Sequence, residues 1–325
     1  MLRVFSPDQP KPLLGVDAMS GGLPSGTVWI DMVTPTRDEE VFIETATGIL
    51  VPTLDEMDEI ETSSRLYTEN DAIYMTATLA TGIIRDNPET HAVTFILTDA
   101  HLITVRYAPV QSFDRFAGHA ERSPDLCETP AMALVHLIEA IVDRLADGIE
   151  HICREVDAIS RQAFRRARPA GSQRLSNLVL QTLLSRLGAA QDALSKARDS
   201  AVSLARALGY LAFAAPADAG LGPHIKSQTR DLKSLTDHAS YMGGTITFLL
   251  DAALGLISIE QNAVLKIFSV SAIIFMPPTL VAGIYGMNFD ILPELHWQFG
   301  YPWALGLMIA SAILPYAFFR WRGWL

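Results

Sequence analysis

The sequence predicts an α+β cytoplasmic domain with long helices, followed by a two-helix transmembrane hairpin at the C-terminus. Three observations predict this fold class. Strand and helix signals are mixed up to about residue 125, and from about residue 131 apolar residues repeat with the period of a long helix. Two runs of about 19 residues without a formal charge then close the chain, and each is long enough to cross a bilayer core.

Short strands and turns are predicted in the first part of the chain. Val28 to Val33 is apolar and β-branched, which favours a strand. Residues 34–39 (TPTRDE) then supply N-cap candidates, a proline for a first helical turn and acidic side chains. Ala92 to Leu97 and Leu102 to Tyr107 flank the polar residues 98–101, which predicts a β-hairpin. Together these elements indicate an α/β layer.

An acidic cluster lies between these elements. Five carboxylates within one predicted helical stretch form either a metal site or a solvated face, and the solvated face is the commoner arrangement. Met57 and Ile60, three residues apart, would face inward. The cluster comprises Asp55, Glu56, Asp58, Glu59 and Glu61.

Three long helices are predicted after the α/β layer. A heptad-like repeat indicates an amphipathic helix packed lengthwise against others. A second run, from Leu175 to about Phe213, follows the breaker-rich RARPAGSQ stretch, so these two helices should form an antiparallel hairpin. A third begins near Ile225 and meets no proline until Pro277, a helix on the order of 75 Å long that would reach into a membrane. The repeat comprises Ile138, Val142, Leu145, Ile149, Ile152, Val156 and Ile159.

The uncharged runs, Ile267 to Tyr285 and Tyr301 to Phe319, are predicted membrane spans. Lys266 precedes the first, Arg320 and Arg322 follow the second, and the loop between them contains no Lys or Arg. The positive-inside tendency therefore places both ends of the hairpin in the cytoplasm. The competing interpretation, a pair of buried core helices, must explain two such runs placed back to back.

These elements divide the chain into six segments. We expect a cytoplasmic α/β domain at 1–125, a helical hairpin at 126–224, a stalk helix continuing into the first membrane helix at 225–285, an external loop at 286–300, the second membrane helix at 301–319 and a basic cytoplasmic tail at 320–325.

Charge and cysteine content exclude some classes of protein. A formal net charge of −11 and a pI near 5.2 argue against a protein that binds duplex nucleic acid, and cations are the more natural partners. Acidity for solubility alone explains the same charge. Cys127 and Cys153 belong to no C-x-x-C or Cys/His metal pattern, so both are expected to be reduced and structural. The start of the chain carries Pro and Asp where a secretory signal needs apolar residues, which predicts a cytoplasmic N-terminus.

The first span carries a stripe of small or weakly polar residues, reached from Asn262 by steps of three and four. Close approach between copies needs small side chains and a water-filled path needs oxygen atoms, so the stripe predicts the lining of a pore. Helix packing without a conduit is the alternative. The opposite faces hold Ile267, Ile274, Phe275 and Leu280. The predicted lining comprises Asn262, Leu265, Ser269, Ala272, Met276, Thr279, Gly283 and Gly286.

The end of the first span carries a recognisable motif. Residues 285–289 (YGMNF), followed by 292–295 (LPEL), resemble the YGMN…PEL signature of bacterial CorA-type magnesium transporters, which are GMN-motif metal-ion transporters. Residues 259–262 (IEQN), 276–279 (MPPT) and 299–302 (FGYP) also resemble this family. The resemblance is densest from about Thr247 to Leu325, while the N-terminal half matches mainly in layout.

The resemblance implies a homopentamer with a cytoplasmic funnel, lying in the bacterial inner membrane with both termini in the cytoplasm. It implies a pore lined by the first membrane helix of each subunit, and influx of Mg²⁺ with Co²⁺ and Ni²⁺ as surrogate cations. The partners are then further copies of the chain, the lipid bilayer and divalent cations, with no cofactor. The sequence contains no GxxxxGK[ST] loop, so transport should be driven by the membrane potential.

Within this resemblance, Gly286, Met287 and Asn288 form the selectivity loop that binds the hydrated ion at the outer mouth. Mg²⁺ dehydrates reluctantly, so the amides of Asn288 and Asn262 would contact it through coordinated water. Asp290 and Glu294 would raise the local cation concentration.

Two further roles are expected nearer the cytoplasm. Leu265 and Phe268 would form an apolar constriction at the inner end of the pore. Asp251 lies on the extension of the stripe below the membrane, where copies around one axis could bind a divalent cation as a sensor. A solvated helix residue is the alternative for Asp251.

Two other functions compete with magnesium transport. Related GMN proteins include zinc transporters, and Asp290, Glu294 and His296 suit a softer metal, although the PEL and FGYP segments favour the magnesium branch. A membrane-tethered enzyme or sensor would need a catalytic constellation in the first 250 residues. The sequence shows no HExxH or Ser/His/Asp pattern there, so we expect that the protein is not an enzyme.

Overall fold

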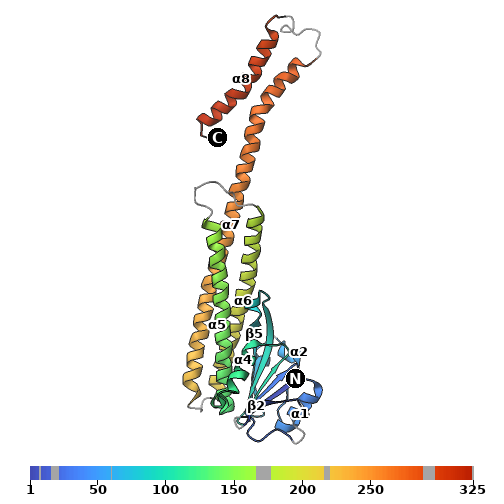
Figure 1. Ribbon diagram of the computed structural model, residues 1–325, viewed down its shortest axis with the longest axis vertical. Helices are drawn as coiled ribbons and strands as arrows, with labels where there is room; N and C mark the ends of the chain where they lie inside the picture. Colours follow the sequence, from blue (N-terminus) through green and yellow to red (C-terminus); the bar gives the residue numbers. More distant parts are fainter. Residues whose placement is uncertain are drawn as a thin grey trace. The chain divides into compact units, whose positions relative to one another are not determined.

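The computed structural model describes residues 1–6, 9–15, 22–59, 61–165, 177–215, 220–287 and 297–323 (Figure 1). The chain divides into two compact units, Met1–Leu250 and Asp251–Leu325, called here the first and second units. One helix, α7 (Leu221–Tyr285), contributes residues to both units.

A seven-stranded sheet organises the start of the first unit, with strand order β2-β1-β3-β7-β6-β5-β4. The central pair β3 and β7 is parallel, and all other neighbouring strands are antiparallel. The predicted strand and the predicted hairpin are confirmed as β3 and as β6 with β7, whose register pairs Val93 with Arg106 and Leu97 with Leu102. The strands are β1 (Leu2–Ser6), β2 (Gln9–Leu14), β3 (Trp29–Val33), β4 (Leu66–Glu69), β5 (Ala72–Thr81), β6 (Glu89–Leu97) and β7 (Leu102–Arg106).

The middle of the sheet encloses a buried charge network centred on Asp31. The Asp31 carboxylate, fully buried, accepts hydrogen bonds from Arg106 Nη2 at 3.0 Å and Nε at 3.2 Å. Arg3 Nε donates to the same carboxylate at 2.9 Å, and Thr104 Oγ1 donates at 2.9 Å. Trp29 Nε1 in turn donates to Thr104 Oγ1 at 3.0 Å. A buried charge is tolerated only when it is paired and hydrogen-bonded, and here every partner comes from three adjacent strands, β1, β3 and β7.

Helices cover both faces of the sheet. One face packs against α1 (Arg37–Thr47) and the one-turn helix α2 (Leu54–Met57), through a core that includes Ile43 and Met57. The other face packs against α4 (Gln111–Ala120), α5 (Pro130–Arg165) and α6 (Asn177–Ala214), through Phe95, Phe113 and Leu204. The fold class is therefore confirmed as an α/β layer with long helices. The short helices α3 (Thr62–Arg65), η2 (Ile83–Arg85) and η3 (Pro124–Cys127) complete this part.

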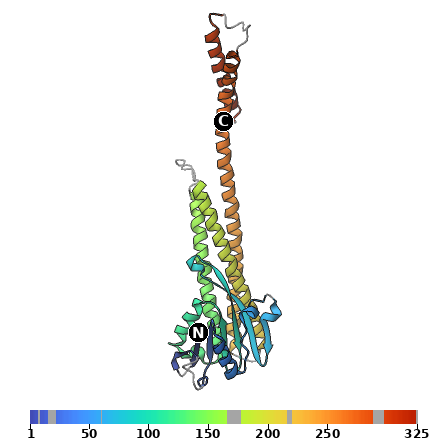
Figure 2. The ribbon, with the colours of Figure 1, turned by 90° about the vertical axis from the view of Figure 1, so that its right-hand side faces the viewer.

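Three long helices run side by side in the first unit, as Figures 1 and 2 both show. All seven residues of the predicted heptad repeat are buried on α5, which confirms the amphipathic helix. The predicted second helix is confirmed as α6, which returns antiparallel to α5, with Arg186 Nε donating to Glu155 Oε1 at 2.8 Å. The third helix, α7, begins at Leu221, four residues before the predicted start.

Two local predictions need correction. The N-cap of α1 is Thr36, whose hydroxyl accepts from Glu39 N while the Glu39 carboxylate accepts from Thr36 N, so Pro35 precedes the cap instead of occupying the first turn. The acidic stretch is not one helix, because the helix that a second capping box starts at Thr53, α2, ends after one turn. Only Asp55 and Glu56 lie on it, and the other three carboxylates lie between α2 and α3. All five carboxylate residues are exposed, as expected for a solvated face, and Met57 is buried, whereas Ile60 lies outside the described residues.

Both cysteines are free thiols, as predicted. Cys127, at the end of η3, is buried, and burial raises the pKa of its thiol to about 12. Cys153, on α5, is half-buried with Sγ 3.3 Å from His238 Nε2, and desolvation raises its pKa as well. Raised pKa values keep both sulfurs in the thiol form at neutral pH, so neither is an activated nucleophile.

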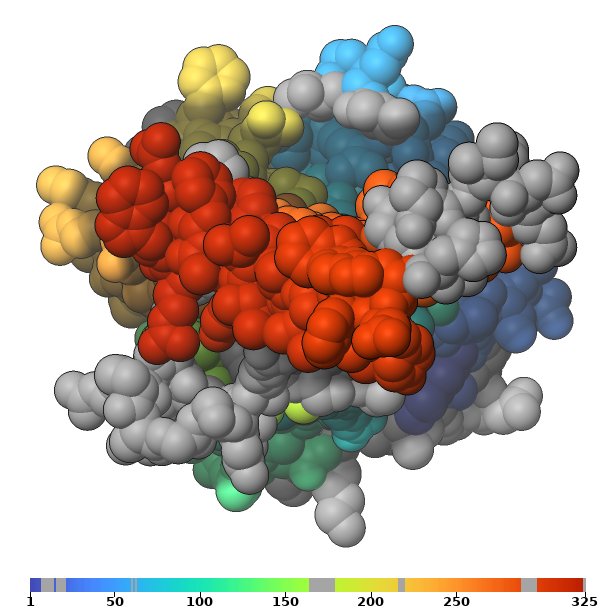
Figure 3. Space-filling view, turned by 90° about the horizontal axis from the view of Figure 1, so that it is seen from above, coloured from blue at the N-terminus to red at the C-terminus, as the bar shows by residue number. Residues whose placement is uncertain are grey.

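The second unit contains the two candidate membrane spans. The C-terminal part of α7 and α8 (Gly300–Trp321) are long and apolar enough to cross a bilayer. No residue in the apolar window of α7 is buried against the rest of the described chain, which contradicts the core-helix interpretation. The side chains of these two helices form the orange and red surface in Figure 3.

Replacing Asp31 should destabilise the first unit strongly. Asp31→Ala leaves Arg3 and Arg106 without their buried counter-charge, which costs about 3–5 kcal/mol. The measurement is the shift of the urea midpoint of the full chain in detergent, followed by circular dichroism. Asp114→Ala is the matched control, because this carboxylate contacts the same two arginines but is 59% exposed, and its loss should cost at most about 1 kcal/mol. Equal midpoints for the two variants would contradict the proposed role of Asp31.

Alkylation should distinguish the two thiols. At pH 8 the folded protein should react at Cys153 slowly and at Cys127 hardly at all, since the thiolate is the reacting species and burial suppresses it. Mass spectrometry of tryptic peptides after timed iodoacetamide treatment measures both rates. In denaturant the two rates should become equal, and a fast reaction at Cys127 in the folded chain would show that its burial is wrong.

Candidate functional site

The predicted pore stripe lies on the part of α7 that belongs to the second unit. The N-terminal end of the stripe, from Asp251 through Asn262 to Leu265, is exposed on the single chain, and so is Phe268. Residues of the opposite faces, such as Phe275 and Leu280, are also exposed. Because residues of both faces are exposed on the single chain, the pore-lining role of the stripe stays a prediction.

A shallow groove brings part of the stripe together. It follows α7 over about four turns, because small side chains at Ala272, Thr279 and Gly283 leave a hollow between larger neighbours. Gly286, just beyond the helix, donates its backbone N–H to Ala282 O at 2.9 Å. The groove is lined by Ala272, Phe275, Met276, Thr279, Leu280, Gly283, Ile284 and Met287, five of which were predicted as lining or selectivity residues.

The hydroxyl groups of the stripe are oriented by the helix backbone. Thr279 Oγ1 donates to Phe275 O at 2.7 Å, and Ser269 Oγ donates to Leu265 O at 2.9 Å. A hydroxyl that has given its proton to the backbone keeps acceptor lone pairs only. These two groups therefore present oxygen acceptors, which suit a cation or the protons of its coordinated water.

Two adjacent prolines release backbone carbonyls that we did not predict. Pro277 and Pro278 lie inside α7 and have no N–H, so the carbonyls of Ile273 and Ile274 lose their intrahelical donors. Backbone carbonyls without a donor are tolerated at membrane depth when they face protein or a water-filled cavity. The sequence signal for them was the Pro-Pro pair itself, four residues beyond each released carbonyl.

Ser269 lies at the border of the stripe. Its side chain lines a second groove, between α7 and α8, instead of the groove that holds Ala272 and Met276.

Along α7 from residue 261 onward, Lys266 carries the only formal charge among the described residues. An ion passing along this helix would meet oxygen dipoles and no carboxylate, so it would exchange little of its water.

The helix ends just before the predicted selectivity loop. α7 ends at Tyr285, and Met287 N donates to Ile284 O at 3.2 Å. Asn288, Asp290, Glu294 and His296 lie outside the described residues, so the geometry of the loop beyond Met287 is not part of this structure.

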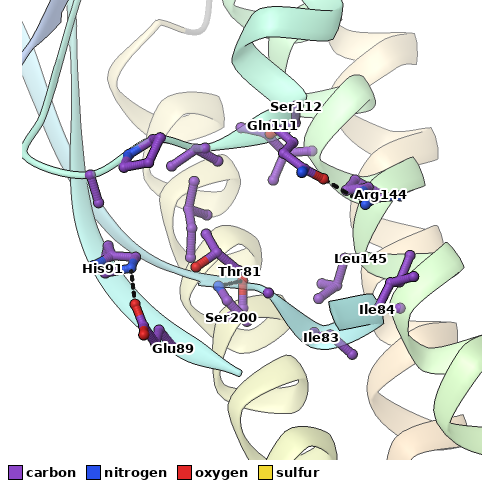
Figure 4. Close-up of a pocket in the computed structure, with 18 of the residues that line it drawn as sticks. Thr81, Ile83, Ile84, Glu89, His91, Gln111, Ser112, Arg144, Leu145 and Ser200 are labelled. Carbon is purple, nitrogen blue, oxygen red and sulfur yellow. Dashed lines mark hydrogen bonds and ion pairs between the residues drawn. The ribbon is translucent and has the colours of Figure 1, made fainter. Parts of the chain in front are cut away.

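The first unit contains a polar pocket of about 250 Å³ between the ends of β5 and β6, η2 and α5 (Figure 4). His91 Nε2 lies 3.4 Å from Glu89 Oε2 on one side, and Arg144 Nη2 donates to Gln111 Oε1 at 2.6 Å on the other. The Ser200 hydroxyl accepts from Ala80 N at 3.2 Å, and within the described chain no pocket hydroxyl is hydrogen-bonded to His91. His91 is paired with Glu89, but no hydroxyl among the described pocket residues is placed to act as a nucleophile beside it. These pocket residues therefore do not form the nucleophile–base pair of a hydrolase.

The two candidate spans of α7 and α8 indicate a protein of the membrane-spanning class. A family model described as CorA-like Mg2+ transporter protein matches residues 24–321. The chain belongs to this family, which confirms the resemblance found in the sequence.

The names of two individual relatives agree with this family. The magnesium transport protein CorA of Pasteurella multocida is 34% identical over 327 residues, covering 100% of both chains. The complete structure of the CorA magnesium transporter from Methanocaldococcus jannaschii matches with a TM-score of 0.79 at 18% identity, covering 100% of this chain and 99% of that one.

A zinc-related structure is more distant. The cytoplasmic domain of ZntB from Vibrio parahaemolyticus matches with a TM-score of 0.54 at 12% identity, covering 78% of this chain and 96% of that one. At this identity the match shows a shared fold only. The zinc alternative is therefore not favoured over magnesium.

Proposed function

We propose that the protein mediates influx of Mg²⁺, and of Co²⁺ and Ni²⁺ as surrogate cations, through a homopentameric pore lined by α7. The single observation that carries this proposal is the match of the CorA-like Mg2+ transporter family model to residues 24–321. A liposome flux assay that compares Mg²⁺, Co²⁺, Ni²⁺ and Zn²⁺ side by side tests it. Faster flux of Zn²⁺ than of Mg²⁺ would contradict it.

The ion moves with most of its water in this mechanism. Gly286, Met287 and Asn288 of each copy hold the hydrated ion at the outer mouth, while Asp290 and Glu294 concentrate cations near it. The hydroxyl oxygen of Thr279 then accepts hydrogen bonds from the coordinated water. Asn262 repeats the amide contact further along, and Leu265 with Phe268 narrows the inner end with apolar side chains.

The membrane potential supplies the driving force. Moving two charges through about 100 mV releases roughly 4.6 kcal/mol, enough for uptake from dilute solution. Lys266, Arg320 and Arg322 at the same end of the hairpin support a cytoplasmic position for both termini and an inner-membrane location.

Asp251 is proposed as the cytoplasmic sensor. Copies of this exposed carboxylate around a fivefold axis would repel one another when empty, and a bound divalent cation would neutralise them and favour a closed, symmetric funnel. High internal Mg²⁺ would then close the pore and low internal Mg²⁺ would open it.

Asn288→Ala should nearly abolish Mg²⁺ uptake without impairing folding or assembly, because the amide is proposed to hold the hydrated ion and not to support a core. Uptake into liposomes, with size-exclusion chromatography as the assembly control, measures this. Asp290→Asn and Glu294→Gln should cause milder losses that shrink at high ionic strength, since exposed charges are screened by salt. Wild-type uptake in Asn288→Ala would exclude the selectivity-loop assignment.

Asp251→Asn should weaken inhibition by internal Mg²⁺. The neutral amide relieves the repulsion without an ion, so the ion loses its differential effect on the two states. Flux into vesicles preloaded with graded Mg²⁺ gives the half-inhibiting concentration, which should rise several-fold. Asp237→Asn, a charge-matched change elsewhere on α7, should leave it unchanged. An unaltered value in Asp251→Asn would place the sensor elsewhere.

A further inference from the structure

A groove of about 130 Å³ lies between α7 and α8 in the second unit. The two helices run side by side there in both Figure 1 and Figure 2. Seven residues line it, five from α7 and two from α8: Lys266, Ser269, Val270, Ile273, Ile274, Tyr316 and Phe319.

The groove is apolar except at one end. Val270, Ile273 and Ile274 form its α7 wall, and the Ser269 hydroxyl is already used by Leu265 O. The ammonium group of Lys266 marks the polar end. It forms no ion pair with any residue that the structure describes, so its charge has no protein counter-ion there.

A second positive charge lies at the same end. Arg320 directly follows Phe319 on α8, and its Nη1 is 3.5 Å from the Tyr316 hydroxyl. The described residues from 261 to 287 and from 297 to 323 include no Asp or Glu. The end of the groove is therefore positively charged and lacks a carboxylate partner within this part of the chain.

The position of the groove along the spans indicates what can fill it. Lys266 immediately precedes the uncharged run that begins at Ile267, so the charged end lies at the membrane surface and the apolar walls extend into the hydrocarbon. Lysine at such a position extends its ammonium toward the headgroup region. A ligand with an anionic head and a long apolar tail matches both parts.

We propose that this groove binds one anionic phospholipid of the cytoplasmic leaflet, with its phosphate at Lys266 and Arg320 and an acyl chain along Val270, Ile273 and Phe319. Basic pockets between membrane helices on the cytoplasmic side bind acidic headgroups by the same electrostatics. A bound chain would also brace α7 against α8, next to Ser269 on the border of the pore stripe. The lipid site rests on the proposed orientation, with the Lys266 end of the hairpin at the cytoplasmic surface, and does not depend on which ion is carried.

Native mass spectrometry of the full-length protein tests the proposal. The detergent-solubilised protein is titrated with phosphatidylglycerol or with phosphatidylcholine of the same acyl chains, and bound lipid per subunit is counted. Wild type should retain phosphatidylglycerol preferentially. Lys266→Gln should weaken its binding about five-fold, the equivalent of about 1 kcal/mol for one basic residue near the membrane surface. Ile273→Trp should fill the groove and lower retention without changing charge.

Arg322→Gln is the matched control. It removes the same charge from the same end of the hairpin, but its guanidinium lies over the Phe318 ring at 5.8 Å and does not line the groove. Its phosphatidylglycerol affinity should equal that of wild type. The proposal is overturned if Lys266→Gln binds like wild type, if Arg322→Gln loses as much, or if both lipids bind equally. Loss of the oligomer in Ile273→Trp with unchanged lipid binding would show that a second copy of the chain covers the groove.

Discussion

The rest of the structure depends on one helix, α7, whose N-terminal part lies in water and whose C-terminal part lies in the hydrocarbon of the membrane. α7 is continuous from Leu221 to Tyr285, and an α-helix closes nearly all its backbone hydrogen bonds within itself, so the backbone can pass from water into hydrocarbon without exposing polar groups. Only the side chains change along it. In the first unit α7 buries one side, with Leu232, Ala239 and Ile246, against α5 and α6. From Ile267 to Tyr285 it carries no charged residue, and no residue of its apolar window is buried within the described chain.

The same constraint shapes the proposed ion path. A carboxylate in the membrane segment would be costly to desolvate and would hold a divalent cation too tightly for rapid release. α7 offers instead neutral acceptor oxygens, such as the Thr279 hydroxyl in the groove of the stripe. Such neutral ligands suit an ion that keeps its water. The carboxylates proposed to act on the ion, at Asp251, Asp290 and Glu294, lie on either side of the segment.

The candidate site could be placed from the sequence only in part. The three-and-four stepping located Ala272, Met276, Thr279 and Gly283 on one groove, because helical periodicity is local. It could not show that Ser269 faces α8, since that depends on how a second helix packs.

Local patterns in the sequence determined the long helices, the two candidate spans, the β6–β7 hairpin and the family motif, since each depends on residues within a few turns or across one tight turn. Only the tertiary structure decided the order of the seven strands, the parallel pairing of β3 with β7 and the meeting of Asp31 with Arg106, which lie far apart in the chain. The physical reason is that strand pairing and buried charge networks gain their free energy from non-local contacts. No local period or propensity encodes those contacts.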